Sequence, residues 1–174
     1  MVSFLEPEDI VNQLKLRPDY HAAEFGCGPG GFVIPLAKKL GKGMVYALDI
    51  QEEPLSALRG RARAEGLNNF KEITCDLEEP KGSTLQDNTL DIVIVSNILF
   101  QAESKEAMLK EAKRITKLKG KIVVIDWKKD SPFGPTEERV SPDELHKIAV
   151  KLDLKKIKDL EAGTYHWGAV YEKV

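Results

Sequence analysis

A glycine-rich stretch near the start of the chain has the residue types that can hold the nucleoside part of a ligand. Gly26, Gly28, Gly30 and Gly31 follow an acidic residue, Glu24. Glycine lets the backbone turn tightly and come close to a ligand, because it has no Cβ atom. The free amides of a helix that begins after the stretch would face the same ligand.

The spacing of these glycines fits two kinds of nucleotide-binding loop. Gly26, Gly28 and Gly31 match G-x-G-x-x-G, which is typical of dinucleotide enzymes. Gly26, Gly28 and Gly30 match G-x-G-x-G, which suits a nucleoside sulfonium. A glycine-rich turn without a ligand is the plain structural alternative.

Two aspartates follow the glycine stretch at the ends of predicted strands. Asp49 ends the second strand, where a carboxylate can accept hydrogen bonds from both hydroxyls of a ribose. Asp76 ends the third strand, where it can accept a hydrogen bond from the amino group of an adenine. Aspartate is also common in turns, so each residue has a purely structural interpretation as well.

The elements that must position these residues alternate between apolar runs and helical stretches. This alternation favours an α/β fold with a mostly parallel sheet and helices on both faces. The predicted strands are 21–25, 44–50, 70–75, 90–96, 121–126, 154–160 and 166–171. The predicted helices are 7–16, 32–40, 52–65, 103–116 and 142–152, with loops at 77–89 and 130–139.

The last two strands depart from the alternation, since only residues 161–164 separate them. They should pair as an antiparallel hairpin at the edge of the sheet. The whole chain, 1–174, then forms a single domain with one doubly wound, Rossmann-like sheet of seven strands. Its parts are an opening helix and lid candidate (1–17), a nucleotide-binding core (18–153) and the terminal hairpin (154–174).

Composition sets limits on the class of protein. The chain has 174 residues, of which 42% are hydrophobic, and a formal net charge of -2. This charge gives little drive for binding nucleic acid. No apolar run approaches the roughly 20 residues that span a membrane, and the acidic N-terminus lacks the order of a signal peptide, so we expect a cytoplasmic protein. The two cysteines, Cys27 and Cys75, are too few for a zinc site, and we expect no metal.

Taken together, these motifs give the chain a resemblance to the class I S-adenosylmethionine-dependent methyltransferases. Residues 24–30 resemble their first motif, an acidic residue followed by G-x-G-x-G. Asp49 falls at their ribose-binding position, 75–77 at their adenine-side motif, and 90–97 resembles their fourth-strand motif. The terminal hairpin is also a family trait that dinucleotide dehydrogenases usually lack. The resemblance implies the strand order three-two-one-four-five-seven-six.

The resemblance also implies S-adenosylmethionine as cofactor and a role for each motif residue. Glu24 would lie near the methionine amino group, directly or through water, and Ile50 would pack on the adenine. Asn97 would lie beside the methionine end and face the substrate. The full implied cofactor-binding set is Glu24, Gly26, Cys27, Gly28, Gly30, Asp49, Ile50, Asp76, Leu77 and Asn97.

The acceptor should bind outside the carboxyl ends of the strands, as ligands do in open α/β sheets. The catalytic candidates there are Asn97, Asp126 and His166. His166 could act as a general base, and its alternative is a packed side chain with hydrogen bonds at the sheet edge. The loop 130–139 and the opening segment 3–16 are the candidate lids.

The fourth strand argues for a small-molecule acceptor. Base-directed amino-methyltransferases often carry Asp/Asn-Pro-Pro-Tyr after this strand, whereas this chain has Ser96-Asn97-Ile98-Leu99. Residues 97–101 and 126–127 look more like the branch that includes quinone-ring methyltransferases. Three alternatives stay open: an RNA or protein methyltransferase, a non-catalytic cofactor-binding subunit, and an oxidoreductase. At this length we expect no added substrate domain, so the acceptor site is either open or completed by a homodimer mate or a partner subunit.

Overall fold

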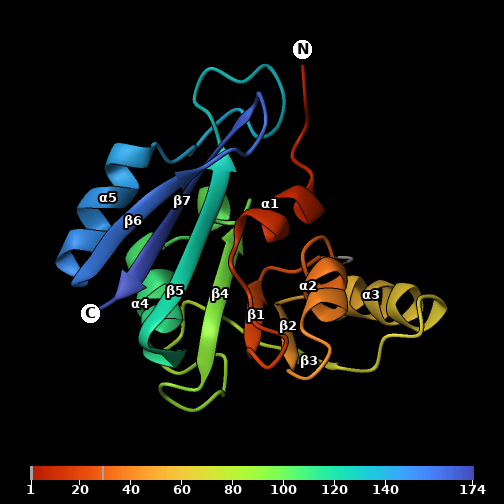
Figure 1. Ribbon diagram of the computed structural model, residues 1–174. Coiled ribbons are helices and arrows are strands. Elements are labelled where there is room, and N and C mark those ends of the chain that lie inside the picture. The colour runs from red at the N-terminus through yellow and green to blue at the C-terminus, as the bar shows by residue number, and fades with distance from the viewer. Residues whose placement is uncertain (1, 29) are drawn as a thin grey trace.

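Seven strands form one sheet in the computed structural model, which describes residues 2–28 and 30–174 (Figure 1). Met1 and Pro29, which fall in the predicted N-terminal part and the glycine motif, lie outside the described residues. The strands are β1 (Ala22–Phe25), β2 (Val45–Asp49), β3 (Phe70–Thr74), β4 (Leu90–Ser96), β5 (Thr116–Trp127), β6 (Leu154–Leu160) and β7 (His166–Lys173).

The order across the sheet is β3-β2-β1-β4-β5-β7-β6. Strands β1 to β5 pair in parallel, and β7 runs antiparallel to both β5 and β6. The predicted doubly wound sheet, its strand order and its terminal antiparallel hairpin are therefore confirmed.

Helices cover both faces of this sheet. Helices α1 (Pro7–Gln13), α2 (Val33–Lys39) and α3 (Glu52–Ala64) pack on one face, and α4 (Lys105–Ile115) and α5 (Pro142–Lys151) pack on the other. Figure 1 shows the first group at the front and right and the second group behind the sheet on the left. Among the described residues, no helix combines the length and apolar character that a membrane crossing requires.

The buried central strands explain why the sheet forms. Alternate side chains of β4 enter different cores, with Ile92 and Ile94 beneath α1 and α2, and Val93 and Val95 beneath α4 and α5. A strand buried on both faces needs an almost continuous apolar run, which this sequence supplies. Strand β4 therefore lies between β1 and β5, which run parallel to it, and the carboxyl ends of the three strands meet at one edge of the sheet.

Several predicted boundaries were wrong. The predicted helix 103–116 ends at Ile115, and β5 begins at once with Thr116, where a start at residue 121 was expected. Thr116 is buried and pairs with Leu90, and the register then shifts before Ile92. Because the residues that follow Thr116 are mostly lysine and glycine, hydrophobic periodicity does not predict this pairing. The first helix also stops early, since Leu14 has an extended backbone.

Candidate functional site

The first cavity of interest lies at the carboxyl ends of β1, β2 and β3 and beside the segment that follows β4. Its volume is about 310 Å³. This is the edge where open α/β sheets bind their ligands. The lining residues are Gly26, Gly28, Asp49, Ile50, Gln51, Pro54, Cys75, Asp76, Leu77, Glu78, Ile98, Gln101, Ala102 and Met108.

Six members of the implied cofactor-binding set line this cavity, and four do not. Gly26, Gly28, Asp49, Ile50, Asp76 and Leu77 are in the lining. Glu24, Cys27, Gly30 and Asn97 are outside it. The sequence motifs therefore come together in space, and the structure separates those that face the cavity from those behind it.

Gly28 forms part of the cavity wall with its backbone. Its φ is +50°, and a Cβ atom added there would point into open space. Its N–H donates to the Asp49 Oδ2 atom at 3.0 Å. A side chain at this position would be strained by the positive φ and would project where the backbone now meets the cavity.

Asp49 holds the loop and faces the cavity with the same carboxylate. While Oδ2 accepts from Gly28, Oδ1 accepts from the Gln51 N–H at 3.0 Å. A carboxylate has about four lone-pair sites, so both oxygens can still accept from a ligand's hydroxyl groups. The half-buried position of Asp49 leaves it accessible for that contact.

Glu24 is buried beneath the loop and stabilises the start of α2. Its Oε2 atom accepts from the N–H groups of Phe32 at 3.0 Å and Val33 at 2.8 Å. Burial raises the pKa of Glu24 to about 8, although these two amide hydrogen bonds act in the opposite direction. The glycine loop is therefore fixed to the helix by a carboxyl group that holds its proton readily.

Cys27 lies between the two glycines but points into the core. Its side chain is buried, and its thiol donates to the Gly28 carbonyl at 3.5 Å. Burial raises the pKa of this thiol, with further repulsion from Glu24 and Asp49. A thiol held protonated in this way is not a nucleophile, so Cys27 supports the loop through its backbone.

The far wall of the cavity comes from residues that the sequence motifs do not mark. Ile98 and Ala102 belong to the segment after β4, which contains a short 3₁₀ helix, η1 (Leu99–Gln101). Glu78 fixes the loop after β3, because its carboxylate accepts from the N–H groups of Glu103 and Ser104 at 3.0 and 2.7 Å. Ligands of open α/β sheets bind at the carboxyl ends of the strands, and this rule points to Ile98 and Ala102, which follow β4. Met108 follows the pattern of a buried helix residue, so the sequence does not indicate that it lines a cavity.

The three predicted catalytic residues share an unusual property. Among the described residues, four buried side-chain N or O atoms have no hydrogen-bond partner: Asn97 Oδ1, Asp126 Oδ2, His166 Nδ1 and His166 Nε2. They come from the ends of β4 and β5 and the beginning of β7, which are neighbouring strands. Buried polar groups almost always have a partner, so this concentration marks the edge as a place for a polar ligand.

Asp126 and His166 nevertheless face opposite sides of the sheet. His166 pairs with Trp127 in the ladder, and their rings are 4.0 Å apart between centroids. Asp126 pairs instead with Trp167, whose side chain belongs to the core under α4 and α5. Neighbouring residues of a strand point to opposite faces. The two groups therefore do not form a hydrogen-bonded acid–base pair.

Burial governs the charge of both groups. It lowers the pKa of His166 to about 4, with a smaller contribution from Lys128, so the imidazole is neutral at pH 7. It raises the pKa of Asp126 to about 6, against hydrogen bonds from the backbone N–H groups of Trp127 and Leu99. Asp126 Oδ1 accepts from the N–H of Trp127, its neighbour in β5, at 2.8 Å.

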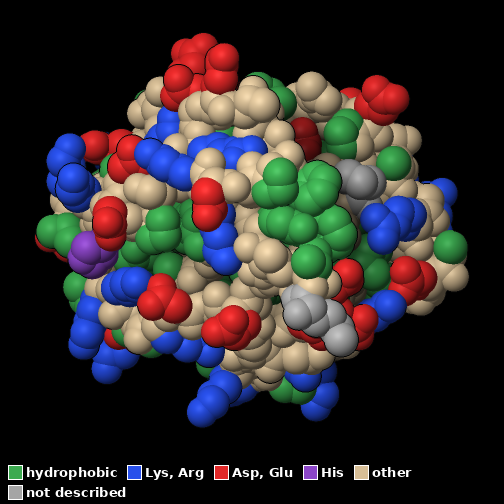
Figure 2. All heavy atoms as spheres, turned by 90° about the horizontal axis from the view of Figure 1, so that it is seen from above, with side chains coloured by type: hydrophobic (Ala, Val, Ile, Leu, Met, Phe, Trp, Pro, Cys, Tyr) green, Lys and Arg blue, Asp and Glu red, His purple; other side chains and the backbone are tan. Residues whose placement is uncertain are grey.

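Aromatic side chains from three segments gather around Tyr165, the residue that precedes His166. The rings of Phe4, Phe133 and Tyr165 are 4.9 to 5.8 Å apart between centroids. These residues belong to the N-terminal segment, the loop after β5 and the β6–β7 turn. Figure 2, which views the sheet from its carboxyl edge, shows a patch of hydrophobic side chains near the middle of this face. Both candidate lids therefore meet over this edge.

Hydrogen bonds join the N-terminal segment to the β6–β7 turn and shape the loop after β5. Ser3 exchanges backbone and side-chain bonds with Thr164: its carbonyl accepts from the Thr164 N–H at 2.9 Å, and its N–H donates to Oγ1 at 3.0 Å. The Arg139 guanidinium donates to the carbonyls of Lys128, Ser131 and Phe133 at 2.7 to 3.0 Å. No group of three or more potential metal ligands occurs within residues 2–28 and 30–174.

Comparison with known proteins agrees with this geometry. A family profile described as a methyltransferase domain matches residues 16–166. A solved SAM-dependent methyltransferase from Aquifex aeolicus is 28% identical, with a TM-score of 0.88 over 98% of this chain and 91% of that one.

Two curated relatives show the range of similar enzymes. Demethylmenaquinone methyltransferase of Geobacillus kaustophilus is 30% identical over 73% of this chain and 53% of that protein. Norajmaline N-methyltransferase of Rauvolfia serpentina is 27% identical over 78% of this chain and 43% of that protein. The chain thus spans about half the length of the curated relatives that it matches. The sheet order, the glycine loop and the family match together show that the chain belongs to the class I S-adenosylmethionine-dependent methyltransferase family.

Proposed function

We propose that this chain transfers a methyl group from S-adenosylmethionine to a small-molecule acceptor by in-line displacement. The observation that carries the proposal is the placement of two features at one sheet edge. The cavity with the glycine loop and Asp49 lies at the ends of β1 to β3, and the unpartnered atoms of Asn97, Asp126 and His166 follow at β4, β5 and β7. A donor and an acceptor can thus be held side by side.

The cavity residues fit the cofactor. Asp49 has the free lone pairs to accept from both ribose hydroxyls, and the backbone at Gly28 leaves room beneath them. Ile50, Asp76 and Leu77 supply an apolar contact and a carboxylate for the adenine. Asn97 is the candidate for the methionine end. When bound, S-adenosylmethionine supplies a methyl group on a sulfonium, which is a strong electrophile.

The chain's own residues then have to align the acceptor. Holding two reactants in line can contribute about 7–11 kcal/mol to such a step. The aromatic rings of Phe4, Phe133 and Tyr165 favour a flat or apolar acceptor body, and the neutral His166 offers one donor and one acceptor nitrogen. The curated relatives named for demethylmenaquinone and norajmaline agree with a small acceptor.

His166 and Asp126 receive different roles in this proposal. His166 lies against the Trp127 ring and can take a proton from the acceptor, which in general contributes about 10²–10⁴-fold to rate. Asp126 accepts from the N–H of Trp127, so we assign it a positioning role at the end of β5. Its unpartnered Oδ2 is the atom through which it could also reach the acceptor.

The first test is calorimetric titration of the chain with S-adenosylmethionine, S-adenosylhomocysteine and NADH. We expect micromolar affinity for the first two and none for NADH. A screen with labelled methyl groups over small aromatic molecules, total RNA and protein extracts then identifies the acceptor class. Tight binding of NADH, or labelling of RNA or protein in preference to every small molecule, would overturn the proposal.

A further inference from the structure

A second cavity, larger than the first, lies at the opposite edge of the sheet. Its volume is about 590 Å³. It opens where β4 and β5 begin and extends under the end of α1 to the hairpin of β6 and β7. The lining residues are Leu14, Lys15, Leu16, Tyr20, Asp91, Ile92, Lys117, Leu118, Lys119, Gly120, Lys121, Ile157, Lys158 and Val170. We call it the lysine groove.

The floor of the lysine groove is apolar. Leu14, Ile92 and Val170 are buried members of the core beneath α1. At the rim, Leu118 is 65% exposed and Ile157 is 43% exposed, so two large apolar side chains stand in solvent. The groove exists because α1 is short and stops at Gln13, which leaves the adjoining face of β5 and β7 without a covering helix.

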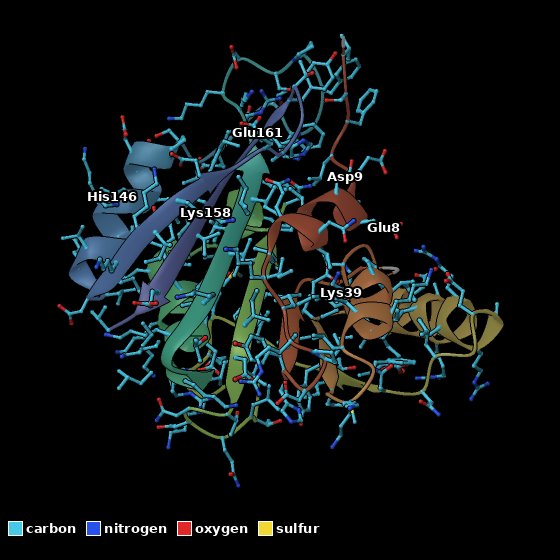
Figure 3. The ribbon with its side chains drawn as sticks, viewed as in Figure 1. Glu8, Asp9, Lys39, His146, Lys158 and Glu161 are labelled. Atoms are coloured by element: carbon cyan, nitrogen blue, oxygen red, sulfur yellow. The ribbon has the colours of Figure 1, made fainter. Side chains whose placement is uncertain are left out.

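The walls of the groove are cationic. Five lysines and a single aspartate line it. Lys117 pairs with Asp91 at 2.8 Å, and Lys121 pairs with Glu172 on β7. Lys158 reaches from β6 toward α1 and donates to the Gln13 carbonyl at 2.9 Å, as its position in Figure 3 shows.

Lys15 and Lys119 complete the walls, and they differ from the other three lysines. Within the described part of the chain, neither of them makes a hydrogen bond or ion pair to a neighbouring group. Both side chains are exposed. Their ammonium groups are therefore available to a ligand, each with three donors.

We propose that the lysine groove binds a small amphipathic anion, a carboxylate or phosphate carried on a hydrocarbon body. A volume of about 590 Å³ lies within the usual range of small-molecule sites. The free ammonium groups match the anionic head, and the apolar floor and rim match the hydrocarbon. An inorganic anion would leave the apolar floor in contact with water, and a neutral hydrocarbon would form no ion pair or hydrogen bond with the Lys15 and Lys119 ammonium groups.

The test is a titration of the ¹⁵N-labelled chain, followed by NMR, with decanoate, decan-1-ol and inorganic phosphate. We expect decanoate to give saturable shifts confined to the amides of 14–16, 117–121 and 157–158. Decanol and phosphate should each bind at least fivefold more weakly. Lys15→Gln with Lys119→Gln keeps much of the stem length and removes both charges, and should weaken decanoate at least fivefold. Lys110→Gln with Lys147→Gln, two exposed lysines on α4 and α5, should leave the affinity unchanged.

Several outcomes would overturn the proposal. Equal affinity for decanol and decanoate would mean that the groove binds hydrocarbon without recognising the anionic group. Equal shifts with phosphate would mean that it binds anions without recognising the hydrocarbon. If the chain sediments with phosphatidylglycerol vesicles but does not bind monomeric decanoate, the groove binds a membrane surface. If it binds single-stranded RNA more tightly than decanoate, the groove binds nucleic acid. Because the groove lies at the far edge of the sheet, its failure would leave the affinity for S-adenosylmethionine unaffected.

Discussion

The Asp49 carboxylate links the position of the glycine loop to the binding of a ligand. It accepts from Gly28 and Gln51 at 3.0 Å each, and it lines the cavity at the same time. These two sets of hydrogen bonds form in different states of the protein. The backbone bonds fix the loop in the free protein, whereas bonds to ribose hydroxyls form only when a ligand binds.

The substitution Asp49→Ala should weaken the binding of S-adenosylmethionine at least tenfold. A hydrogen bond to a charged group contributes about 1.5–3 kcal/mol, and the variant loses such bonds to the ribose. Calorimetry gives the affinity directly. Asp159→Ala, an exposed aspartate on the edge strand β6, is the matched control and should bind as the unchanged chain does. Equal affinities in both variants would remove Asp49 from the site.

Glu24 makes folding sensitive to pH. Burial raises its pKa to about 8 from an ordinary 4.5. Between these values the folded chain holds a proton that the unfolded chain releases. The contribution of Glu24 to the free energy of unfolding is therefore complete below about pH 4.5 and is lost as the pH rises toward 8.

Glu24→Gln should remove this dependence. The amide oxygen can still accept from Phe32 and Val33, so the start of α2 keeps its hydrogen bonds. Relative to this variant, the unfolding free energy of the unchanged chain should fall between about pH 5 and 8, by at most about 1.4 kcal/mol per pH unit. Urea unfolding at a series of pH values measures the difference. A constant difference would mean that Glu24 is ionised throughout.

His166 should affect turnover and not cofactor affinity. His166→Phe keeps a ring against Trp127 and removes both unpartnered nitrogens. If the imidazole accepts the acceptor's proton, turnover with the acceptor from the screen should fall at least tenfold. Binding of S-adenosylmethionine should stay within twofold. Because the pKa of His166 is about 4, its ionisation should leave the rate flat between about pH 6 and 8. A normal rate in the variant would make His166 a packing residue.

At the scale of elements, the acceptor edge depends on a loop with little secondary structure. Residues 128–139 are shaped by one side chain, since Arg139 donates to carbonyls spread from Lys128 to Pro135. The loop carries Phe133 to the aromatic cluster with Phe4 and Tyr165. Its order should therefore be lost as a unit when the guanidinium is removed.

Arg139→Ala should increase amide hydrogen exchange in 128–135 and raise KM for the acceptor severalfold, with unchanged affinity for S-adenosylmethionine. A lysine cannot replace the planar fork of donors, so Arg139→Lys should behave similarly. The control is Arg17→Ala, which removes an exposed arginine that pairs with Asp19 and lies over the Tyr20 ring, far from this loop in the sequence. Unchanged exchange in 128–135 would show that the flanking strands alone order the loop.

The sheet could be predicted because its strands are apolar runs. The features that the sequence did not predict depend on how the strands pair. The strand order came with the resemblance, and the edge rule placed Asn97, Asp126 and His166 together. The side of the sheet that each residue faces depends on the β5–β7 register, which periodicity does not supply. The early start of β5 has the same cause, since Lys117 and Lys119 look like loop residues until Thr116 pairs with Leu90.

At the scale of the whole molecule, the two edges of the sheet have separate chemistry. The carboxyl edge carries the cofactor cavity with Asp49 and Asp76, and the other edge carries the lysine groove. The buried strands β1, β4 and β5 stand between them, so each edge is built on the same rigid core. A ligand that binds only the folded chain should stabilise all of it, whichever edge it occupies.

S-adenosylmethionine should therefore raise the midpoint of thermal unfolding of the entire chain. At about 100 times its Kd, a ligand contributes about 2.7 kcal/mol to the free energy of unfolding. For a chain of this size each kcal/mol corresponds to about 2–4 °C, so the expected rise is about 5–11 °C. Scanning calorimetry measures it, with NADH and the Asp49→Ala variant at the same ligand concentration as controls. The rise should shrink by several degrees in the variant and be absent with NADH. An equal rise with NADH would mean that the cavity accepts any adenosine-containing ligand and does not select the cofactor.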